Sequence, residues 1–420
     1  MKAFTLPIAL FALAVGFAPA ARAQNAVIYW NNEALDVTRL SRNPPPIAAL
    51  HLATFHAAIF EAVNGISRTH TSWISHDPAP EGADMDAAIA SAAHTALLAL
   101  WKDEANPRNI EVAYQDALAK VQEGKAKQDG IAYGREVAEL VLARRESATL
   151  NPPPPAPYSS TEQGKWRETP PFFRPPVAPS AATTTPYVMT SPSQFRAPPP
   201  PSMDSKEYAE ALAFVAKVGS RDHAQRTLDQ TLTSPFWADD LGTVTPAGHW
   251  NVIAQDLARR NNLGVVESAR LFALLNFATA DAGIACWDSK FYYRTWRPEN
   301  GIRETDPRIN PGVALDPNFI PTMVAPAHPD YVCGHCTFSS AATRLLELYF
   351  GKDKIEFTTT SDGLPGVVRT FKSLTEAREE VGMSRVYGGI HTMPAVREGT
   401  KMGLRVAEYV FDTALLPLKK

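Results

Sequence analysis

Three short segments in the second half of the chain carry basic side chains and histidines that could bind a tetrahedral oxyanion. They cover residues 290–298 (KFYYRTWRP), 328–338 (HPDYVCGHCTF) and 384–391 (SRVYGGIH). Lysine and arginine donate charge-assisted hydrogen bonds to oxyanions, while histidine can transfer a proton or offer its lone pair to phosphorus or a metal. The residue types therefore favour chemistry on a phosphate-like anion.

The first segment places two cations seven residues apart. On a continuous α-helix, seven residues correspond to about 700° of rotation, so Lys290 and Arg297 would point within roughly 20° of each other. We expect both on one long helix that begins near Gly264 and that Pro298 stops. Two cations on one helix face are also typical of a solvated surface, so this segment alone does not decide the chemistry.

The second segment turns at Gly334 into an apolar helix that we expect over residues 335–350. The first turn of a helix leaves backbone N–H groups free and carries the positive end of the helix dipole, and both favour an anion there. His335, in this first turn, could donate or accept a proton at a bound oxyanion. A capping or core role for His335 is the alternative interpretation.

The third segment combines Ser384, Arg385 and His391 with a glycine pair, Gly388 and Gly389. A straight helix would point Arg385 and His391 in different directions, whereas a turn at two glycines allows both to face one point. Arginine offers a fork of donors to an oxyanion, and a neutral imidazole offers one lone pair for a covalent bond. This segment therefore completes a candidate anion site.

In their order, the patterns K-x6-R-P, x-G-H and S-R-x5-H resemble the signature of the superfamily of type 2 phosphatidic acid phosphatases and vanadium-dependent haloperoxidases. The stretch Ala282 to Arg303 and the Pro-rich region around Trp166 look like the soluble bacterial haloperoxidase-like branch. The resemblance covers about residues 30–412 and implies an all-α fold of helical bundles.

The resemblance implies a role for each residue of the three segments. His391 would be the apical ligand of vanadium in a haloperoxidase or the phosphorylated nucleophile in a phosphatase, and His335 would be the acid–base group on the opposite side. Vanadate resembles the five-coordinate transition state of phosphoryl transfer, so one site can serve both reactions. The implied oxyanion-binding set is Lys290, Arg297, Cys333, Gly334, Ser384 and Arg385.

Vanadium-dependent haloperoxidase activity is the function that the resemblance favours first. The cofactor would be vanadate, and phosphate would compete with it or replace it. The substrates would be peroxide and a halide. A periplasmic acid phosphatase that acts on a phosphoester through a phosphohistidine is the alternative. A degenerate member that binds the oxyanion without turnover is a third hypothesis.

Two positions depart from the superfamily pattern. Cys333 replaces a serine whose hydroxyl would donate a hydrogen bond to the anion, and a thiol is only a weak donor. Ala395 stands four residues after His391, where the superfamily usually has an aspartate that orients the histidine ring. Glu398 is the candidate substitute for that aspartate.

Cys333 and Cys336 form a C-x-x-C pattern within the second segment. A structural or regulatory disulfide and a thiol–disulfide exchange site both agree with this pattern, although the strand–turn–helix context of thioredoxin-like proteins is missing. We interpret Cys286 as a small core residue. Three cysteines are too few for a disulfide scaffold, so the fold must rest on its hydrophobic core.

Composition excludes several classes of function. The chain has 420 residues, 45% of them hydrophobic, with 41 basic and 44 acidic residues and a net charge of −3. Because no Lys/Arg run occurs, we expect no nucleic-acid partner. Residues 1–23 combine a charged start, an apolar run and Ala-Arg-Ala, which is typical of a cleavable signal peptide. We therefore expect an exported protein, periplasmic or secreted, without a transmembrane domain; a homo-oligomer is compatible with the sequence.

Helical periodicity dominates the regular parts of the chain and predicts about ten or eleven helices with no strand–helix alternation. We expect an N-terminal helical region over residues 24–151, an ordered Pro-rich coil over 152–203 and a C-terminal helical bundle over 204–420 that carries the oxyanion site. Because 16 of the 36 prolines accompany many aromatic residues in the coil, we expect it to pack its rings on the helices at both sides. These rings belong to Trp166, Phe172, Phe173, Tyr187 and Phe195. The expected helices cover residues 45–64, 85–101, 107–124, 129–146, 204–217, 222–233, 246–261, 264–290, 335–350, 374–384 and 395–412.

Overall fold

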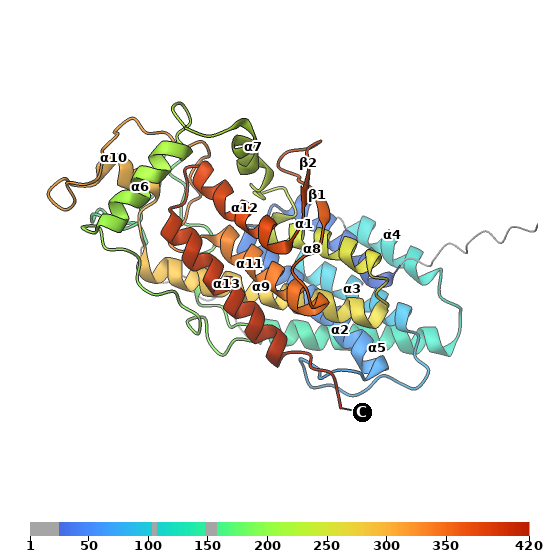
Figure 1. Ribbon diagram of the computed structural model, residues 1–420. Helices are drawn as coiled ribbons and strands as arrows, with labels where there is room; N and C mark the ends of the chain where they lie inside the picture. The colour runs from blue at the N-terminus through green and yellow to red at the C-terminus, as the bar shows by residue number, and fades with distance from the viewer. Residues whose placement is uncertain (1–24, 103–106, 148–157, 420) are drawn as a thin grey trace, which may run out of the picture.

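The computed structural model describes residues 25–102, 107–147 and 158–419, so the expected signal peptide lies outside the described residues. Within these ranges the chain forms thirteen α-helices, one short 3-10 helix and one pair of antiparallel strands (Figure 1). The prediction of a helical fold is therefore confirmed. The elements are α1 (Ala26–Ser41), α2 (Pro45–Ser67), α3 (Met85–Leu100), α4 (Pro107–Leu118), α5 (Lys125–Ser147), η1 (Pro179–Ala182), α6 (Lys206–Gly219), α7 (Leu228–Phe236), α8 (Thr245–Arg260), α9 (Val265–Tyr293), α10 (Pro298–Glu304), α11 (Gly334–Phe350), β1 (Phe357–Thr360), β2 (Val368–Phe371), α12 (Leu374–Tyr387) and α13 (Met393–Thr413).

Helix α9 is the central element of the fold. It is almost continuously buried from Ser268 to Phe291 and packs against α2, α11 and α13. A small residue permits the close contact with α11, because a Cβ atom added at Gly283 would lie 2.8 Å from the ring of Phe338. The first turns of α11, which carry His335, are thus fixed against the middle of α9.

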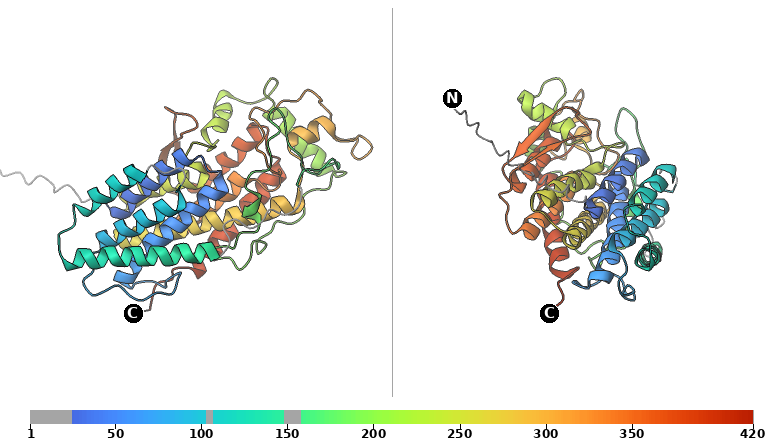
Figure 2. Two further views of the ribbon diagram at one scale, coloured as in Figure 1. Left: turned by 180° about the vertical axis from the view of Figure 1, so that it is seen from behind. Right: turned by 90° about the vertical axis from the view of Figure 1, so that its right-hand side faces the viewer.

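Helix α9 lies between two groups of helices. The right-hand view of Figure 2 shows the blue to green-cyan helices α1–α5 on one side and the orange to red helices α11–α13 on the other, in agreement with the packing of α2 and α11 on α9. Within the C-terminal group, α13 lies against α11 so closely that a Cβ atom at Gly399 would stand 2.7 Å from the carbonyl oxygen of Cys333. The domain boundaries at residues 151 and 204 stay predictions.

Two helices of the core are strongly apolar. By length and composition, α2 and α9 could each cross a membrane. The most apolar 18-residue windows of these helices are 89% and 94% buried inside the protein. Both therefore have the burial of core helices.

The Pro-rich coil is ordered over residues 158–203 because α9 holds it through a buried carboxylate. Asp281 accepts hydrogen bonds from the backbone N–H groups of Tyr187, Val188 and Met189, at 2.6–2.8 Å. The ring of Tyr187 stacks on Phe277, one turn earlier on the same helix. The coil is therefore attached to α9 by both polar and apolar contacts.

The rings of the coil divide into a packed and an exposed set. Trp166 is fully buried, and the ring of Phe195 lies 5.7 Å from that of Tyr409 on α13. Phe172 and Phe173 are each 62% exposed, so the expectation that all five rings pack on the helices is wrong for this pair. Both rings stand beside the residues that form a cavity wall described below.

Several short elements were not expected from the hydrophobic periodicity of the sequence. The strands β1 and β2 have four residues each, and α10 has seven, too few for a helical or strand period to stand out. Helix α1 begins after Asn25, whose side chain caps it. Helix α7 covers Leu228–Phe236 rather than residues 222–233, because Thr227 and Gln230 form a capping box at its start.

Candidate active site

Lys290 and Arg297 do not lie on one helix, so the expectation of a shared helix face is wrong. Helix α9 ends at Tyr293 because Arg294 adopts the left-handed conformation with φ 53°, and Arg297 is extended and forms the N-cap of α10. Both cations nevertheless contact the loop of residues 328–330. Lys290 Nζ donates to two carbonyl oxygens of this loop at 2.6 and 3.1 Å, and Arg297 Nε donates to one at 2.6 Å.

The second segment forms the start of α11, as predicted. Cys333 is the N-cap and Gly334 the first helical residue, so His335 lies in the first turn. The backbone N–H of Cys333 donates to the carbonyl oxygen of Ala395 at 2.9 Å, which fixes this helix start to α13. Helix α11 therefore directs the free N–H groups of its first turn at the region between the three segments.

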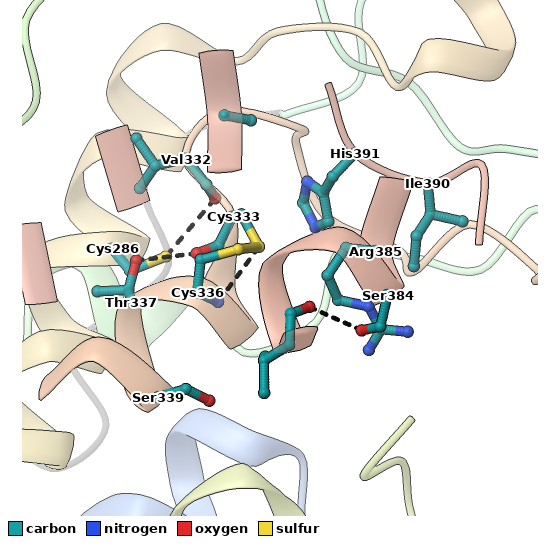
Figure 3. The surroundings of a disulfide bond; sticks show 12 residues. Cys286, Val332, Cys333, Cys336, Thr337, Ser339, Ser384, Arg385, Ile390 and His391 are labelled. Carbon is teal, nitrogen blue, oxygen red and sulfur yellow. Dashed lines mark hydrogen bonds between the residues drawn. A yellow bond between two sulfur atoms is a disulfide. The ribbon is translucent and has the colours of Figure 1, made fainter. Parts of the chain in front are cut away.

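Cys333 and Cys336 form a disulfide bond across the first turn of α11 (Figure 3). Of the alternatives compatible with the C-x-x-C pattern, the structure thus has the bonded pair, while Cys286 is a buried free thiol. Cys333 has no S–H to donate, and its Sγ instead accepts from the backbone N–H of Cys336 at 3.2 Å. In Figure 3, Arg385 and His391 lie on the side of the disulfide opposite Cys286.

His391 is buried and held by a carboxylate that the sequence reasoning did not identify. Its Nδ1 lies 2.6 Å from Asp330 Oδ1, and Arg297 donates to its Nε2 at 3.2 Å. The second oxygen of Asp330 accepts from the hydroxyl of Thr392 at 2.7 Å. This network assigns the ring proton of His391 to Nδ1 and leaves Nε2 unprotonated, with its lone pair accepting from Arg297.

The electrostatics around His391 keep its imidazole neutral. Burial and the neighbouring cations Arg297 and Lys290 hold the pKa of His391 well below its ordinary value. Burial also raises the pKa of Asp330 to about 6, against the opposing effect of Arg297. At neutral pH the pair is therefore a carboxylate bonded to a neutral histidine.

Asp330, and not Glu398, is the carboxylate that orients the ring of His391. The carboxylate of Glu398 pairs with Arg397 at 3.0 Å and with Lys401 at 2.9 Å, and both partners lie on α13 beside it. The position four residues after His391 is likewise occupied by a fully buried alanine, Ala395. The orienting carboxylate therefore comes from the loop before α11, in the same segment that supplies His335.

Three cations of the site are buried without an ion-pair partner. Lys290, Arg297 and Arg385 are each at most 1% exposed, and none forms a salt bridge within the described ranges. Burial lowers the pKa of Lys290 to about 7 and those of both arginines to about 10. Such lowering means that the folded protein solvates these charges poorly, and a bound anion would compensate them.

The third segment places Arg385 in the site, whereas the hydroxyl of Ser384 is bonded within its own helix. Arg385 Nη1 donates to the carbonyl of Trp237 at 2.8 Å and Nη2 contacts the Sδ of Met323, while its buried Nε has no hydrogen-bond partner in the described structure. The hydroxyl of Ser384 donates to Val381 within α12 at 2.7 Å. The unpartnered Nε marks a position where an anion oxygen would be bound.

A backbone carbonyl group of the loop at Ala238 orients the ring of His335. The residue types of this loop do not predict that contact. Its Nε2 lies 2.9 Å from the carbonyl oxygen of Ala238, and burial holds the pKa of His335 well below its ordinary value. Nε2 is therefore the donor and Nδ1 carries the lone pair. The loop is tied down by Asp239, which bonds His249 at 3.1 Å, and His249 in turn bonds Thr359 on β1.

A cavity of about 640 Å³ opens beside these groups. His335, Arg385, the backbone of Gly334 and His328 line it. His328, to which the sequence reasoning gave no role, accepts from Arg297 Nη2 at 3.0 Å through its Nδ1. The described residues contain no group of three or more His, Cys, Asp or Glu that could hold a metal cation. The site combines the unprotonated Nε2 of His391 and Nδ1 of His335 with buried cations and the N–H groups at the start of α11.

Replacing both cysteines by serine, Cys333→Ser with Cys336→Ser, is expected to strengthen vanadate binding about tenfold. A hydroxyl at position 333 supplies the donor that the disulfide lacks, and a hydrogen bond to a charged group contributes about 1.5–3 kcal/mol. Isothermal titration calorimetry measures the change. Cys336→Ser alone is the matched control, because it breaks the same disulfide but leaves only a thiol at position 333. Equal affinities of the double variant and this control would contradict the prediction.

Comparison with known proteins gives one consistent result. Residues 270–419 match a family model described as the VCPO second helical-bundle domain. The chain is 25% identical to a vanadium chloroperoxidase of Curvularia inaequalis over 479 aligned residues, covering 87% of this chain and 78% of that protein. Among solved structures, a bacterial vanadium-dependent iodoperoxidase has a TM-score of 0.81 at 26% identity and covers 94% of this chain and 97% of its own. The holo form of a bacterial vanadium-dependent chloroperoxidase shares the fold with a TM-score of 0.69 at 17% identity, over 92% and 96% of the two chains.

Proposed function

The chain belongs to the superfamily of type 2 phosphatidic acid phosphatases and vanadium haloperoxidases, and we propose that it is a vanadium-dependent haloperoxidase that uses peroxide to oxidise a halide. The observation that carries the proposal is the set of buried cations without ion pairs around the unprotonated Nε2 of His391, to which Arg297 donates. An oxyanion supplies the negative charge that this site lacks.

The residues present fit vanadate. His391 Nε2 would be its protein ligand, because Asp330 fixes the proton on the other ring nitrogen. Lys290, Arg297 and Arg385 would neutralise the charge of its oxygens, together with the N–H groups at the start of α11. When bound, vanadate would activate peroxide toward attack by a halide.

His335 would move the proton that this chemistry requires. Because Nε2 donates to Ala238, the Nδ1 lone pair can accept a proton from peroxide and return it to the leaving oxygen. The depressed pKa of His335 keeps the imidazole neutral and available as a base near neutral pH. His335 would thus act as a general acid–base group, and His391 as a ligand.

An acid phosphatase remains the second candidate on one specific observation. A neutral histidine with a carboxylate on Nδ1 and an unprotonated Nε2 is also the arrangement of a nucleophile that attacks phosphorus. In that reaction, His335 would protonate the leaving oxygen and the same cations would stabilise the transferred phosphoryl group. The two candidates therefore differ in the substrate rather than in the residues that act.

We also propose that the protein works outside the cytoplasm. The signal-like pattern of residues 1–23 supports this placement. The disulfide between Cys333 and Cys336 supports it independently, because disulfides persist in oxidising compartments.

The test combines binding with turnover on one purified sample. We expect vanadate to bind with measurable heat in calorimetry, and the loaded protein to oxidise iodide, bromide or chloride with peroxide. Phosphoester hydrolysis without halide oxidation would favour the phosphatase instead. Binding of vanadate or phosphate without either turnover would identify the degenerate member, and absence of binding by both anions would refute the site.

A further inference from the structure

The cavity beside the oxyanion groups is much larger than peroxide and a halide require. Its volume of about 640 Å³ falls in the range of about 300–1,000 Å³ that holds drug-sized ligands. We propose that it binds the organic molecule to be halogenated, a compound with an apolar ring system and an anionic group; this proposal rests on the proposed haloperoxidase function. The apolar walls and the charged residues of the cavity support this proposal.

The walls of the cavity are mainly apolar and come from segments that are distant in the sequence. Prolines are prominent among them; they donate no backbone hydrogen bond and hold a fixed backbone shape. Such walls favour an apolar body and offer it a preformed surface. The apolar wall residues include Pro44, Pro45, Pro175, Pro176, Trp287 and Phe338.

The reactive groups lie at the buried end of the cavity. Arg385 is 1% exposed, His328 is buried and His335 is only partly accessible, whereas other lining residues are open to solvent. Val324 and Leu241 on the rim are 44% and 38% exposed. A bound apolar molecule would therefore extend from the rim inward to the groups that we propose to hold vanadate.

Two arginines at the open end favour an anionic group on this molecule. Arg42 and Arg174 are both exposed and line the cavity. Arg42 forms no ion pair with any described residue, and Arg174 contacts only a ring, that of Phe172 at 5.1 Å. Both guanidinium groups are therefore available to a carboxylate or a similar anion.

Two acidic residues also line the cavity, and they neutralise only part of the positive charge of its arginines. Asp239 is buried and bonded to His249 at 3.1 Å, and Asp240 accepts from the backbone N–H of Leu241 at 2.8 Å. With Arg42, Arg174 and Arg385, the lining carries three arginines against these two carboxylates. The surplus of positive charge agrees with an anionic ligand.

Two exposed rings precede Arg174 in the chain, and one of them contacts this cavity residue. Phe172 and Phe173, each 62% exposed, directly precede Arg174 and the prolines of the wall. The ring of Phe172 lies 5.1 Å from the guanidinium of Arg174, so apolar surface and a cation stand together here, which matches a ligand that is both apolar and anionic. The overall reaction at such a ligand would be R–H + X⁻ + H₂O₂ + H⁺ → R–X + 2 H₂O. The C–H bond breaks, the C–X bond forms, and peroxide accepts the two electrons.

Binding of a defined probe tests the proposal without any turnover. The probe is 6-hydroxy-2-naphthoate, and 2-naphthol is its neutral counterpart; both are followed by fluorescence titration of the vanadate-free protein. We expect the naphthoate to bind more tightly than the naphthol. Arg42→Gln with Arg174→Gln should weaken naphthoate binding up to about fivefold per arginine, the range for exposed charges, and leave naphthol binding unchanged.

A matched control and a blocking variant sharpen the test. Arg68, like Arg42, is an exposed arginine that ends a helix in the left-handed conformation, but it does not line the cavity, so Arg68→Gln should change neither titration. Val324→Trp, at an exposed rim position, should weaken both ligands by filling the entrance. Wild-type affinity in both the double arginine variant and Val324→Trp would overturn the proposal. Halide oxidation by a protein that binds neither probe would overturn it while leaving the haloperoxidase function intact.

Discussion

His391→Ala will abolish vanadate binding and halide oxidation together. The variant removes the unprotonated Nε2 that we propose as the ligand of vanadium, while the cations around it stay in place. The cations alone retain weak electrostatic attraction for an oxyanion, so residual binding should be nonspecific and lost at high salt. Calorimetry with vanadate and an iodide oxidation assay with peroxide measure both losses.

His56→Ala is the matched control for this variant. His56 is also a fully buried histidine with a strongly lowered pKa, of about 3, and one ring hydrogen bond, to Asn31. It lies on α2 and does not line the cavity, so its loss should lower stability without changing vanadate affinity. Retained turnover by a folded His391→Ala protein would refute the assignment of the site.

Asp330→Asn will lower vanadate affinity by about 10- to 100-fold, the usual cost of losing the partner that orients a metal-ligating histidine. The amide of the new asparagine can donate a hydrogen bond to Nδ1 of His391, so the ring proton can move to Nε2. The Nε2 lone pair is then no longer available to vanadium. The effect should appear as weaker vanadate binding in calorimetry, at most a small change in secondary structure by circular dichroism, and a rate that recovers at high vanadate concentration.

Asp281→Asn separates this positioning role from the cost of altering any buried carboxylate. Burial raises the pKa of Asp281 to about 6, as it does for Asp330, but Asp281 binds backbone N–H groups of the Pro-rich coil rather than a histidine. We expect Asp281→Asn to lower the unfolding temperature and to leave vanadate affinity near the wild-type value. If both variants lost affinity equally, Asp330 would have only a structural role.

Sequence patterns predicted the parts of the site that depend on residue type and on long helices. Helix α11 begins at Gly334 as expected, because an apolar period of several turns follows a glycine that can open the helix. Lys290 and Arg297 both contact the loop of residues 328–330, and beyond the effect of burial both act with Arg385 to lower the pKa of His335, while their binding of an oxyanion stays a prediction. The chain has 41 lysines and arginines, so these three were selected by their spacing from the glycines and histidines of the motifs rather than by residue type alone.

Other features could not be read from the sequence for physical reasons. The end of α9 depends on the left-handed backbone at Arg294, a residue type that gives no warning of such a turn. Asp330 and His391 meet only through the tertiary packing of two loops that are far apart in the chain. The loop at Ala238 acts through its carbonyl oxygen, which every residue type possesses.

The attachment of the Pro-rich coil also has a consequence for the order in which the protein is made. Arg145, which precedes the coil, donates to the carbonyl oxygen of Thr185 at 3.0 Å, but other anchors come later in the chain. Of these, Asp281 holds residues 187–189, Asp288 pairs with Arg196 at 2.7 Å, and Tyr409 receives the ring of Phe195. A ribosome that adds about 5–20 residues per second delivers these anchors seconds after the coil has emerged. The emerging coil therefore first meets only the partners that precede it, such as Arg145, and its contacts with α9 and α13 form later in synthesis.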